Sequence, residues 1–375
     1  MMSDDPNKKA FKYWFDANAA RALAEQIAGV YQGFNARSFQ RLALKDLESL
    51  ELLARVEQFA AAMRECLPQS IPKALDIILQ SLPEPMKNCD AVAEGWLQWP
   101  LGYFVGAYGL DYYEESIHAM TELTQRFSAE FAIRPFATRY TNRVYDDLLR
   151  LAQSHSSPHV RRWTCEGLRT RLPWGKRLKD LIRDPSPLWP ILETLKDDPE
   201  LYVRRSVANS LNDISKDHPN PVIARCNDWC KGASEERHWV IRHALRTLVK
   251  DGDAAALSVI GYRSPKGLDV RIQVSPKKVT VGDRFTLTVE ILNQHSRRQR
   301  LMIDYAICFA RQGNHVGTKV FKGTTHLLEP GGSVTWVKQH PMKLTTVRRL
   351  YPGKHRVTVQ INGQSFAEST FQLKV

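Results

Sequence analysis

The sequence predicts a two-domain protein in which an α-solenoid of HEAT-like repeats is followed by an Ig-like β-sandwich. Apolar residues recur at helical spacing up to about residue 260, and one segment of that region repeats with a period of about 40 residues. From Leu268 onward the apolar period is close to two. We therefore predict a helical domain at residues 1–262 and a sandwich at residues 263–375. A chain of 375 residues is long enough for two such domains.

The sequence of the first domain predicts a series of short helices. Leu42–Met63 combines strong helix formers with apolar residues at helical spacing, and Asn35 or Ser38 could cap its start. Proline-containing turn signals, such as Asp184-Pro185, recur along the region. They predict helices of roughly 10 to 20 residues with short connections.

Three segments of this domain resemble one another. Each has a valine followed by arginine and leucine at the same offsets, and the valines are Val160, Val203 and Val240. The spacings of 43 and 37 residues fall in the range of HEAT-type repeats. Such repeats bury their apolar faces only by stacking, so the pattern predicts a solenoid.

The last third consists of short β-rich runs separated by turn signals. The runs cover residues 268–274, 285–292, 301–310, 334–340, 355–361 and 369–375. Gly282, Gly331-Gly332 and Asn362-Gly363 mark turns between them. About seven strands in this length indicate a sandwich of immunoglobulin type. The Cys…Trp…Cys signature of true immunoglobulin domains is missing, so we expect a likeness in architecture alone.

Several function classes are disfavoured. The start of the sequence is charged without a secretory apolar region, and no stretch of about 18 apolar residues occurs. The six cysteines are scattered, which suits a reducing cytoplasm. Cys226 and Cys230 lack further ligands at zinc-site spacing, His238 and His243 are five residues apart, and no phosphate-binding glycine loop appears. We expect no metal, no cofactor and no membrane partner.

The charge distribution points to a polyanionic partner. The net charge of +13 lies entirely in residues 262–375, which hold 19 Lys and Arg against 6 Asp and Glu. Residues 1–261 hold 34 of each kind. An excess of basic residues that is confined to one domain favours a nucleic-acid partner. The alternative is a basic surface that only keeps the protein soluble.

Arginines recur on one predicted face of the repeats. Arg162, Arg205 and Arg242 occupy equivalent positions, and Arg169 and Arg246 extend the stripe. Such a row suits a phosphate backbone. The alternative is a solvated face with intrahelical pairs such as Arg162 with Glu166, and the pattern alone does not separate the two.

Two basic loops of the sandwich could also reach DNA. They are Ser296–Arg300, with Arg297, Arg298 and Arg300, and Thr345–Arg349. Arginines of such loops can enter a DNA groove, and the alternative is dispersed surface charge.

Carboxylates stand among the arginines at Glu130, Glu166 and Asp213. They would weaken phosphate binding unless a cationic group comes close. Trp174 follows Glu166 by about two helical turns, and its ring could hold a cation or belong to the core. A cationic group on a polyanion points to alkylated DNA, because N3-methylated purines carry a positive charge.

Four segments together resemble the DNA alkylation repair enzymes of the AlkC/AlkD type, and the AlkC branch with a C-terminal Ig-like domain in particular. They are Ser128–Phe136, Glu166–Trp174, Val207–Pro219 and Trp239–Leu245. The resemblance implies a monofunctional DNA glycosylase that releases N3-methyladenine from duplex DNA, with N3-methylcytosine as a further candidate. It also implies that the base is not enclosed in a pocket, and that the Ig-like domain grips the DNA.

The resemblance further implies that Glu130, Glu166, Trp174 and Asp213 line the catalytic cleft. Glu166 and Glu130 would stabilise the charge that develops on the sugar and would act on the attacking water. Asp213 would make a second contact to the water or the sugar. Trp174 would contact the lesion, and no lyase step is expected. The predicted DNA contacts are Arg134, Arg161, Arg162, Arg169, Arg171, Arg205, Arg242, Arg246, Arg297, Arg298 and Arg300.

We expect a monomer in the bacterial cytoplasm, associated with the nucleoid when it acts. The alternative is a non-catalytic HEAT-repeat scaffold that binds nucleic acid or protein. Such a scaffold would share the basic surfaces but would not need its three carboxylates to converge.

Overall fold

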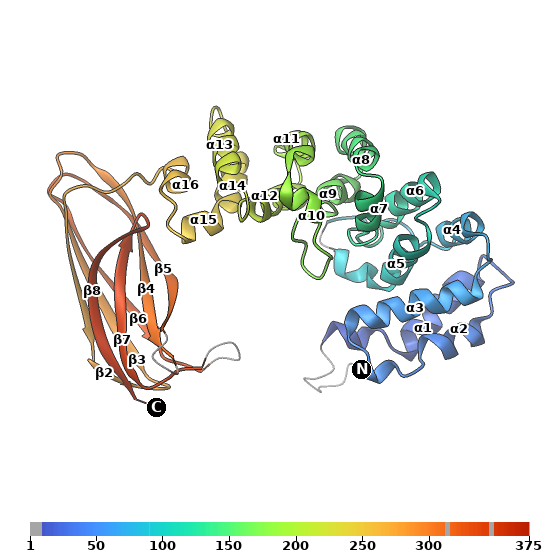
Figure 1. The fold of residues 1–375 in the computed structure, drawn as a ribbon, viewed down its shortest axis with the longest axis horizontal. Helices are drawn as coiled ribbons and strands as arrows, with labels where there is room; N and C mark the ends of the chain where they lie inside the picture. The colour runs from blue at the N-terminus through green and yellow to red at the C-terminus, as the bar shows by residue number, and fades with distance from the viewer. Residues whose placement is uncertain (1–9, 90, 312–315, 345–348, 375) are drawn as a thin grey trace. The chain divides into compact units, whose positions relative to one another are not determined.

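The computed structural model describes residues 10–89, 91–311, 316–344 and 349–374. The chain forms two compact units, Met1–Asp217 and His218–Val375 (Figure 1). The first is helical in its described part. The second begins with helices and ends in strands. None of the helices in the described ranges is long and apolar enough to cross a lipid bilayer.

The first unit is built from short helices joined by short turns. Neighbours pack against one another along the chain, for example α2 on α3, α8 on α9, and α9 on α12. Its helices are α1 (Ala17–Ala28), α2 (Ala36–Ala43), α3 (Leu52–Cys66), α4 (Ile71–Gln80), α5 (Trp99–Tyr108), α6 (Tyr113–Leu123), α7 (Ile133–Arg139), α8 (Asn142–Ser154), α9 (Pro158–Glu166), α10 (Lys179–Arg183), α11 (Trp189–Leu195) and α12 (Leu201–Ile214). The 3₁₀ segments are Phe11–Trp14, Leu47–Ser49, Ala91–Gln98 and Ser186–Leu188.

The helix predicted over Leu42–Met63 is wrong in extent. The chain leaves α2 after Ala43 and enters α3 only at Leu52, and Asp46 between them has a left-handed φ of 51°. Asn35 caps α2, because its side chain accepts a hydrogen bond from the Ser38 amide. The apolar spacing ran through the break because Leu47 is also buried.

The three predicted repeats correspond to helices with the same buried position. Val160 of α9, Val203 of α12 and Val240 of α14 (Glu235–Ala244) are all fully buried. Ser157 stands at the N-cap position of α9, but its side chain makes no capping hydrogen bond. The helical-repeat prediction is confirmed.

The second unit combines the last helices with the sandwich. The helices are α13 (Pro219–Trp229), α14 (Glu235–Ala244), α15 (Arg246–Lys250) and α16 (Ala254–Val259). The strands are β1 (Leu268–Ser275), β2 (Lys278–Thr280), β3 (Arg284–Asn293), β4 (Gln299–Ala310), β5 (Val316–Leu328), β6 (Ser333–Pro341), β7 (Gly353–Ile361) and β8 (Gln364–Lys374). One sheet has the order β1-β3-β6 and the other β2-β8-β7-β4-β5.

The core of the sandwich comes from the alternating apolar positions that predicted it. Phe285, Leu287, Val289 and Ile291 of β3 are buried, and intervening residues are more exposed. As far as the described residues extend, all six predicted runs lie in strands, and the Ig-like architecture is confirmed. Two strands were not predicted, the short β2 and the 13-residue β5.

The helices of the second unit pack closely on its strands. Gly252, which follows α15, meets Gly363 of the β7–β8 turn so tightly that a Cβ on Gly363 would lie 2.5 Å from the Gly252 carbonyl oxygen. Asn362 of the same turn donates from Nδ2 to the Arg263 carbonyl oxygen at 2.7 Å. The compact unit therefore begins at His218, whereas the first sandwich strand begins at Leu268.

Candidate active site

Three of the four predicted catalytic residues line one cavity in the first unit. Glu130 lies in the turn before α7, Glu166 is the last residue of α9, and Trp174 lies in the loop between α9 and α10. The cavity has a volume of about 250 Å³. Its lining consists of Trp99, Phe127, Ser128, Glu130, Phe131, Arg162, Glu166, Leu172, Pro173 and Trp174.

Arg162 joins the two glutamates. Its Nη1 lies 2.8 Å from Glu130 Oε2, and its Nη2 lies 3.3 Å from Glu166 Oε1. Burial opposes the charge of this guanidinium, but the two carboxylates outweigh burial and raise the pKa of Arg162. The guanidinium also lies 5.0 Å from the centre of the Tyr202 ring, a cation–π distance. Arg162 therefore fixes the separation of the two carboxylates.

Glu166 is held on both oxygens. Its Oε1 accepts from Arg169 Nη1 at 2.7 Å, and its Oε2 accepts from the Ser206 hydroxyl at 2.7 Å. Burial alone would raise the pKa of Glu166, but Arg162 and Arg169 together hold it below its usual range. The carboxylate is thus ionised at neutral pH and fixed in position.

Glu130 is less constrained. Its Oε2 accepts from the Ser128 hydroxyl at 2.8 Å and pairs with Arg162. Among the described residues nothing bonds to its Oε1, and its side chain is 15% exposed. Glu130 therefore offers the cavity a carboxylate oxygen that is available to a ligand or a water molecule.

Asp213 does not line the cavity but is tied to it through Arg169. Arg169 Nη2 lies 2.8 Å from Asp213 Oδ2, and Lys216 Nζ lies 3.0 Å from Asp213 Oδ1. Since Arg169 also binds Glu166, the buried ion pairs run without a break from Glu130 to Asp213.

Trp174 is the most exposed residue among the predicted catalytic residues that line the cavity. The residue is 62% exposed, and its backbone has a φ of 63°, which is rare for a residue with a Cβ. Its ring is roughly parallel to that of Trp99, with centroids 6.4 Å apart and an angle of 20°. An exposed indole held in an unfavourable backbone conformation is typical of a ligand-binding position.

Sequence reasoning missed the aromatic wall behind Trp174. Trp99 stacks on Phe131 with centroids 5.4 Å apart and packs on Phe127 at 5.6 Å. Phe127 and Phe131 flank Glu130 in the sequence, which was an available signal. Trp99 stands at the start of α5 and had none. The Ser128 and Ser206 hydroxyls were missed as well.

Two glycines allow the close packing of this site. A Cβ on Gly167 would lie 2.5 Å from Ile133 Cγ2, so only glycine lets the end of α9 approach α7 this closely. A Cβ on Gly175 would lie 3.2 Å from Arg134 Nε. Both glycines follow residues of the site, Glu166 and Trp174, and so set the positions of those side chains.

Burial corrects two of the predicted DNA contacts. Arg134 is 4% exposed, and its guanidinium donates to the carbonyl oxygens of Gly167, Arg169 and Lys176. Burial lowers the pKa of Arg134 to about 10. Arg169 is also buried, between Glu166 and Asp213. Neither guanidinium is available to a phosphate, so both residues position the site.

The other predicted arginines of the first unit differ in exposure. Arg162 is mostly buried in its ion pairs, which favours the alternative of helix-face pairing over an open stripe. Arg161 pairs with Asp198 at 2.6 Å, and Arg171 with Asp217 at 2.7 Å. Arg205 is exposed. The DNA contacts of Arg161, Arg171 and Arg205 remain predictions.

The predicted contacts of the second unit lie nearer the surface. Arg242, Arg297, Arg298 and Arg300 are exposed, and Arg246 is partly exposed. Residues 345–348 of the second predicted basic loop lie outside the described residues. The DNA contacts of these arginines also remain predictions.

In the described part of the chain, no group of three or more His, Cys, Asp or Glu side chains could hold a metal ion. Cys226 and Cys230 are free thiols. Burial raises the pKa of Cys226 to about 12. The thiol is therefore protonated at neutral pH and a poor ligand.

The chain thus joins a helical-repeat unit, which holds two arginine-linked carboxylates and an exposed tryptophan, to an Ig-like sandwich. Residues 269–375 match the family model described as the C-terminal Ig-like domain of the uncharacterised protein YhaZ. The YhaZ protein of Bacillus subtilis (strain 168) is 35% identical over 354 residues, which cover 94% of this chain and 96% of YhaZ.

Among solved structures, the chain is similar to the alkylpurine DNA glycosylase AlkC of Pseudomonas fluorescens, bound to DNA that contains an abasic site analog. The TM-score is 0.88 and the identity 31%, over 98% of this chain and 100% of that one. The chain belongs to the AlkC family, in the branch that carries a C-terminal Ig-like domain.

Proposed function

We propose that this protein is a monofunctional DNA glycosylase of base excision repair. It hydrolyses the N-glycosidic bond of cationic alkylated bases, with N3-methyladenine as the main substrate and N3-methylcytosine as a second. Membership of the AlkC family supports the reaction class, because the Pseudomonas fluorescens relative is an alkylpurine DNA glycosylase. The observation that carries the proposal is the convergence of Glu130, Glu166 and Trp174 on one cavity.

The proposed chemistry needs negative charge more than it needs an acid. A cationic alkylated base leaves readily, so no strong general acid is required. The sugar gains oxocarbenium character as the bond breaks, and carboxylates beside it stabilise that charge. Glu166 suits this role, because its ion pairs keep it ionised and fixed before the substrate binds.

Glu130 is assigned to the attacking water. Its Oε1 has no partner among the described residues, so it can accept a hydrogen bond from water and orient or deprotonate it. The opposite oxygen is held by Ser128 and Arg162, which fix the direction of the carboxylate.

Asp213 and Trp174 take supporting roles in the proposal. Asp213 acts through Arg169 and so positions Glu166, because it does not line the cavity itself. Trp174 contacts the lesion nucleotide through the face of its exposed ring by a cation–π or CH–π contact. Since this ring stands open to solvent, the lesion can be engaged without being enclosed.

The proposed partner is duplex DNA that contains alkylated bases, and the AlkC relative supports it because that protein was solved bound to DNA. We propose that the protein acts as a monomer in the bacterial cytoplasm, on the nucleoid. The proposed reaction uses water as the nucleophile, with neither a cofactor nor a Schiff base.

Release of free base from methylated duplex DNA tests the proposal. Wild type, Glu130→Gln and Glu166→Gln are compared by chromatography of the released bases. We expect wild type to release N3-methyladenine, and each variant to lose at least about a hundredfold in rate. Glu130→Gln is the safer variant for folding, because Glu166→Gln removes a partner from two buried arginines. Tight DNA binding by wild type without base release would instead support the scaffold alternative.

A further inference from the structure

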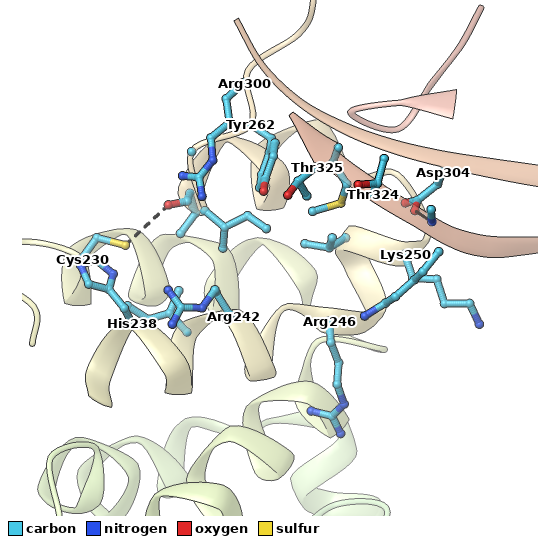
Figure 2. A pocket seen from close by; sticks show the side chains of 18 of the residues that line it. Cys230, His238, Arg242, Arg246, Lys250, Tyr262, Arg300, Asp304, Thr324 and Thr325 are labelled. Atoms are coloured by element: carbon cyan, nitrogen blue, oxygen red, sulfur yellow. Dashed lines mark hydrogen bonds between the residues drawn. The ribbon is translucent and has the colours of Figure 1, made fainter. Parts of the chain in front are cut away.

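A second and larger cavity lies within the unit His218–Val375 and shares no residue with the candidate active site. Its volume is about 750 Å³. Helices α14 and α15 and the turn after α16 form one side, and β4 and β5 form the other (Figure 2). The helical side is braced by a hydrogen bond from the Cys230 thiol to the Val259 carbonyl oxygen at 3.7 Å.

The lining of this cavity is strongly basic. It contains six basic side chains and two carboxylates, those of Glu235 and Asp304. The basic residues are His238, Arg242, Arg246, Lys250, Arg300 and Lys322. Arg242 and Arg300, predicted separately from a helix face and from a loop, are brought together here (Figure 2).

Three of these cations have no ion-pair partner among the described residues. Within the described ranges of the chain, Arg242, Lys250 and Lys322 form no ion pair, although two carboxylates line the same cavity. Asp304 is instead turned to the backbone, where its Oδ1 accepts from the Gly323 amide at 3.0 Å. Burial raises the pKa of Asp304, and the hydrogen bond from Gly323 and the charge of nearby Lys322 lower it again in part.

Other groups of the cavity lining are also suited to bind an anionic ligand. The Arg300 guanidinium lies 4.8 Å from the centre of the Tyr262 ring, which fixes its direction. Thr324 and Thr325 add hydroxyl donors from β5 (Figure 2). Apolar residues complete the lining: Ile241, Val249, Val259, Ile260 and Met302.

We propose that this cavity is a binding site for phosphate groups, formed jointly by the last helices and the β4–β5 edge of the sandwich. The ligand class is a phosphate ester or pyrophosphate anion, and its source is either the DNA backbone or a free nucleotide. Only the DNA source rests on the proposed function. The unpaired cations carry the inference, because phosphate oxygens are the partners that arginine and lysine bind best in such a setting.

The test uses a cavity variant and a matched control in the full chain. The cavity variant is Arg242→Ala with Lys322→Ala, one residue from the helices and one from β5. The control is Lys278→Ala with Lys354→Ala, which removes the same charge from exposed sites on β2 and β7. Strand β2 is the edge opposite β5 in the same sheet. Thermal unfolding checks that both variants stay folded.

Two ligands distinguish the sources, inorganic pyrophosphate and an undamaged DNA duplex, both measured by titration calorimetry at several salt concentrations. For the DNA source, we expect the cavity variant to bind the duplex about tenfold more weakly. Its slope of log affinity against log salt should become shallower by about 1.8, or about 0.9 for each phosphate that the variant no longer neutralises. For a free nucleotide, pyrophosphate binds wild type and the control but not the cavity variant.

Equal losses of affinity in the cavity variant and the control would overturn the proposal, because general electrostatics would then explain them. Wild-type affinity of the cavity variant for both ligands would also overturn it. Base release from methylated DNA is measured on wild type in parallel. A wild type that binds phosphate here but releases no base would refute the glycosylase function and leave this site standing.

Discussion

Arg162 sets the electrostatics of the candidate active site. It bridges Glu130 and Glu166, and Arg169 bridges Glu166 and Asp213, so three carboxylates share two buried guanidinium groups. Lys216 pairs with Asp213 as well, so cations and carboxylates balance in this network, and Glu130 Oε1 is the carboxylate oxygen of Glu130 without a partner among the described residues. A substrate cation can be stabilised without first breaking an ion pair, and the carboxylates need not move as charge develops.

Trp174 provides the cleanest test at the scale of one residue. We expect Trp174→Ala to lower the rate of N3-methyladenine release by about tenfold, because a cation–π contact contributes about 1–2 kcal/mol. The exposed side chain makes little core contact, so the unfolding temperature should change little. Alanine keeps the same constraint on the positive φ, so the variant tests the ring alone.

Trp174→Phe is the control for this experiment, since it retains an aromatic face. The readouts are single-turnover base release at saturating DNA and thermal unfolding. A Trp174→Ala variant that releases base at the wild-type rate would show that the ring does not contact the lesion.

The sequence predicted which residues come together better than it predicted their surroundings. Glu130, Glu166 and Trp174 do converge. Arg169 was predicted as a DNA contact, yet it is buried. Helical spacing identifies a face but not what covers it, and here the partners come from distant positions, as Asp213 does for Arg169. Trp99 was missed for the same reason.

At the scale of elements, the approach of α9 to α7 places Glu166 beside Glu130. Gly167 ends α9 where a Cβ would meet Ile133 Cγ2 at 2.5 Å and the Trp163 carbonyl oxygen at 3.2 Å. Arg134 of α7 then binds the carbonyl oxygens of Gly167 and Arg169. The spacing of the two carboxylates is therefore a property of helix packing.

We expect Gly167→Ala to destabilise the protein by about 1–3 kcal/mol, because the added methyl group forces the two helices apart. Base release should fall as well, since Glu166 moves relative to Glu130. The matched control is Gly102→Ala within α5, where a Cβ meets nothing within 4 Å. That substitution should stabilise the protein by about 0.5–1 kcal/mol, through the helix propensity of alanine.

Denaturant unfolding of the two glycine variants measures this difference. A Gly167→Ala protein as stable and active as wild type would mean that the packing of α7 on α9 tolerates the methyl group and does not set the carboxylate spacing.

The strands show where the alternation of apolar and polar residues in the sequence predicts a strand and where it does not. Buried and more exposed residues alternate along β3, and the run was predicted at its observed place. Strand β5 is an edge strand with many exposed positions and only one buried residue, Leu328. Without an apolar face there is no period-two signal, because solvent contacts both sides of much of the strand.

At the scale of the whole molecule, the excess of basic residues and the candidate active site lie in different units. The excess of basic residues lies in residues 262–375, while the carboxylates of the candidate active site lie in the first unit. The sandwich has its own apolar core, built from residues such as Phe285, Tyr305 and Val357. The helices after His218 share the compact unit of that sandwich.

We therefore expect thermal unfolding to occur in two transitions, one for each compact unit. Gly167→Ala should lower only the transition of the first unit. Gly363→Ala should lower only that of the second, because its φ is +78° and its Cβ would lie 2.5 Å from the Gly252 carbonyl oxygen. Calorimetry of wild type and both variants measures the shifts. A single transition that both substitutions lower equally would mean that the two units unfold cooperatively as one. The division at His218 would then not separate two independently unfolding parts.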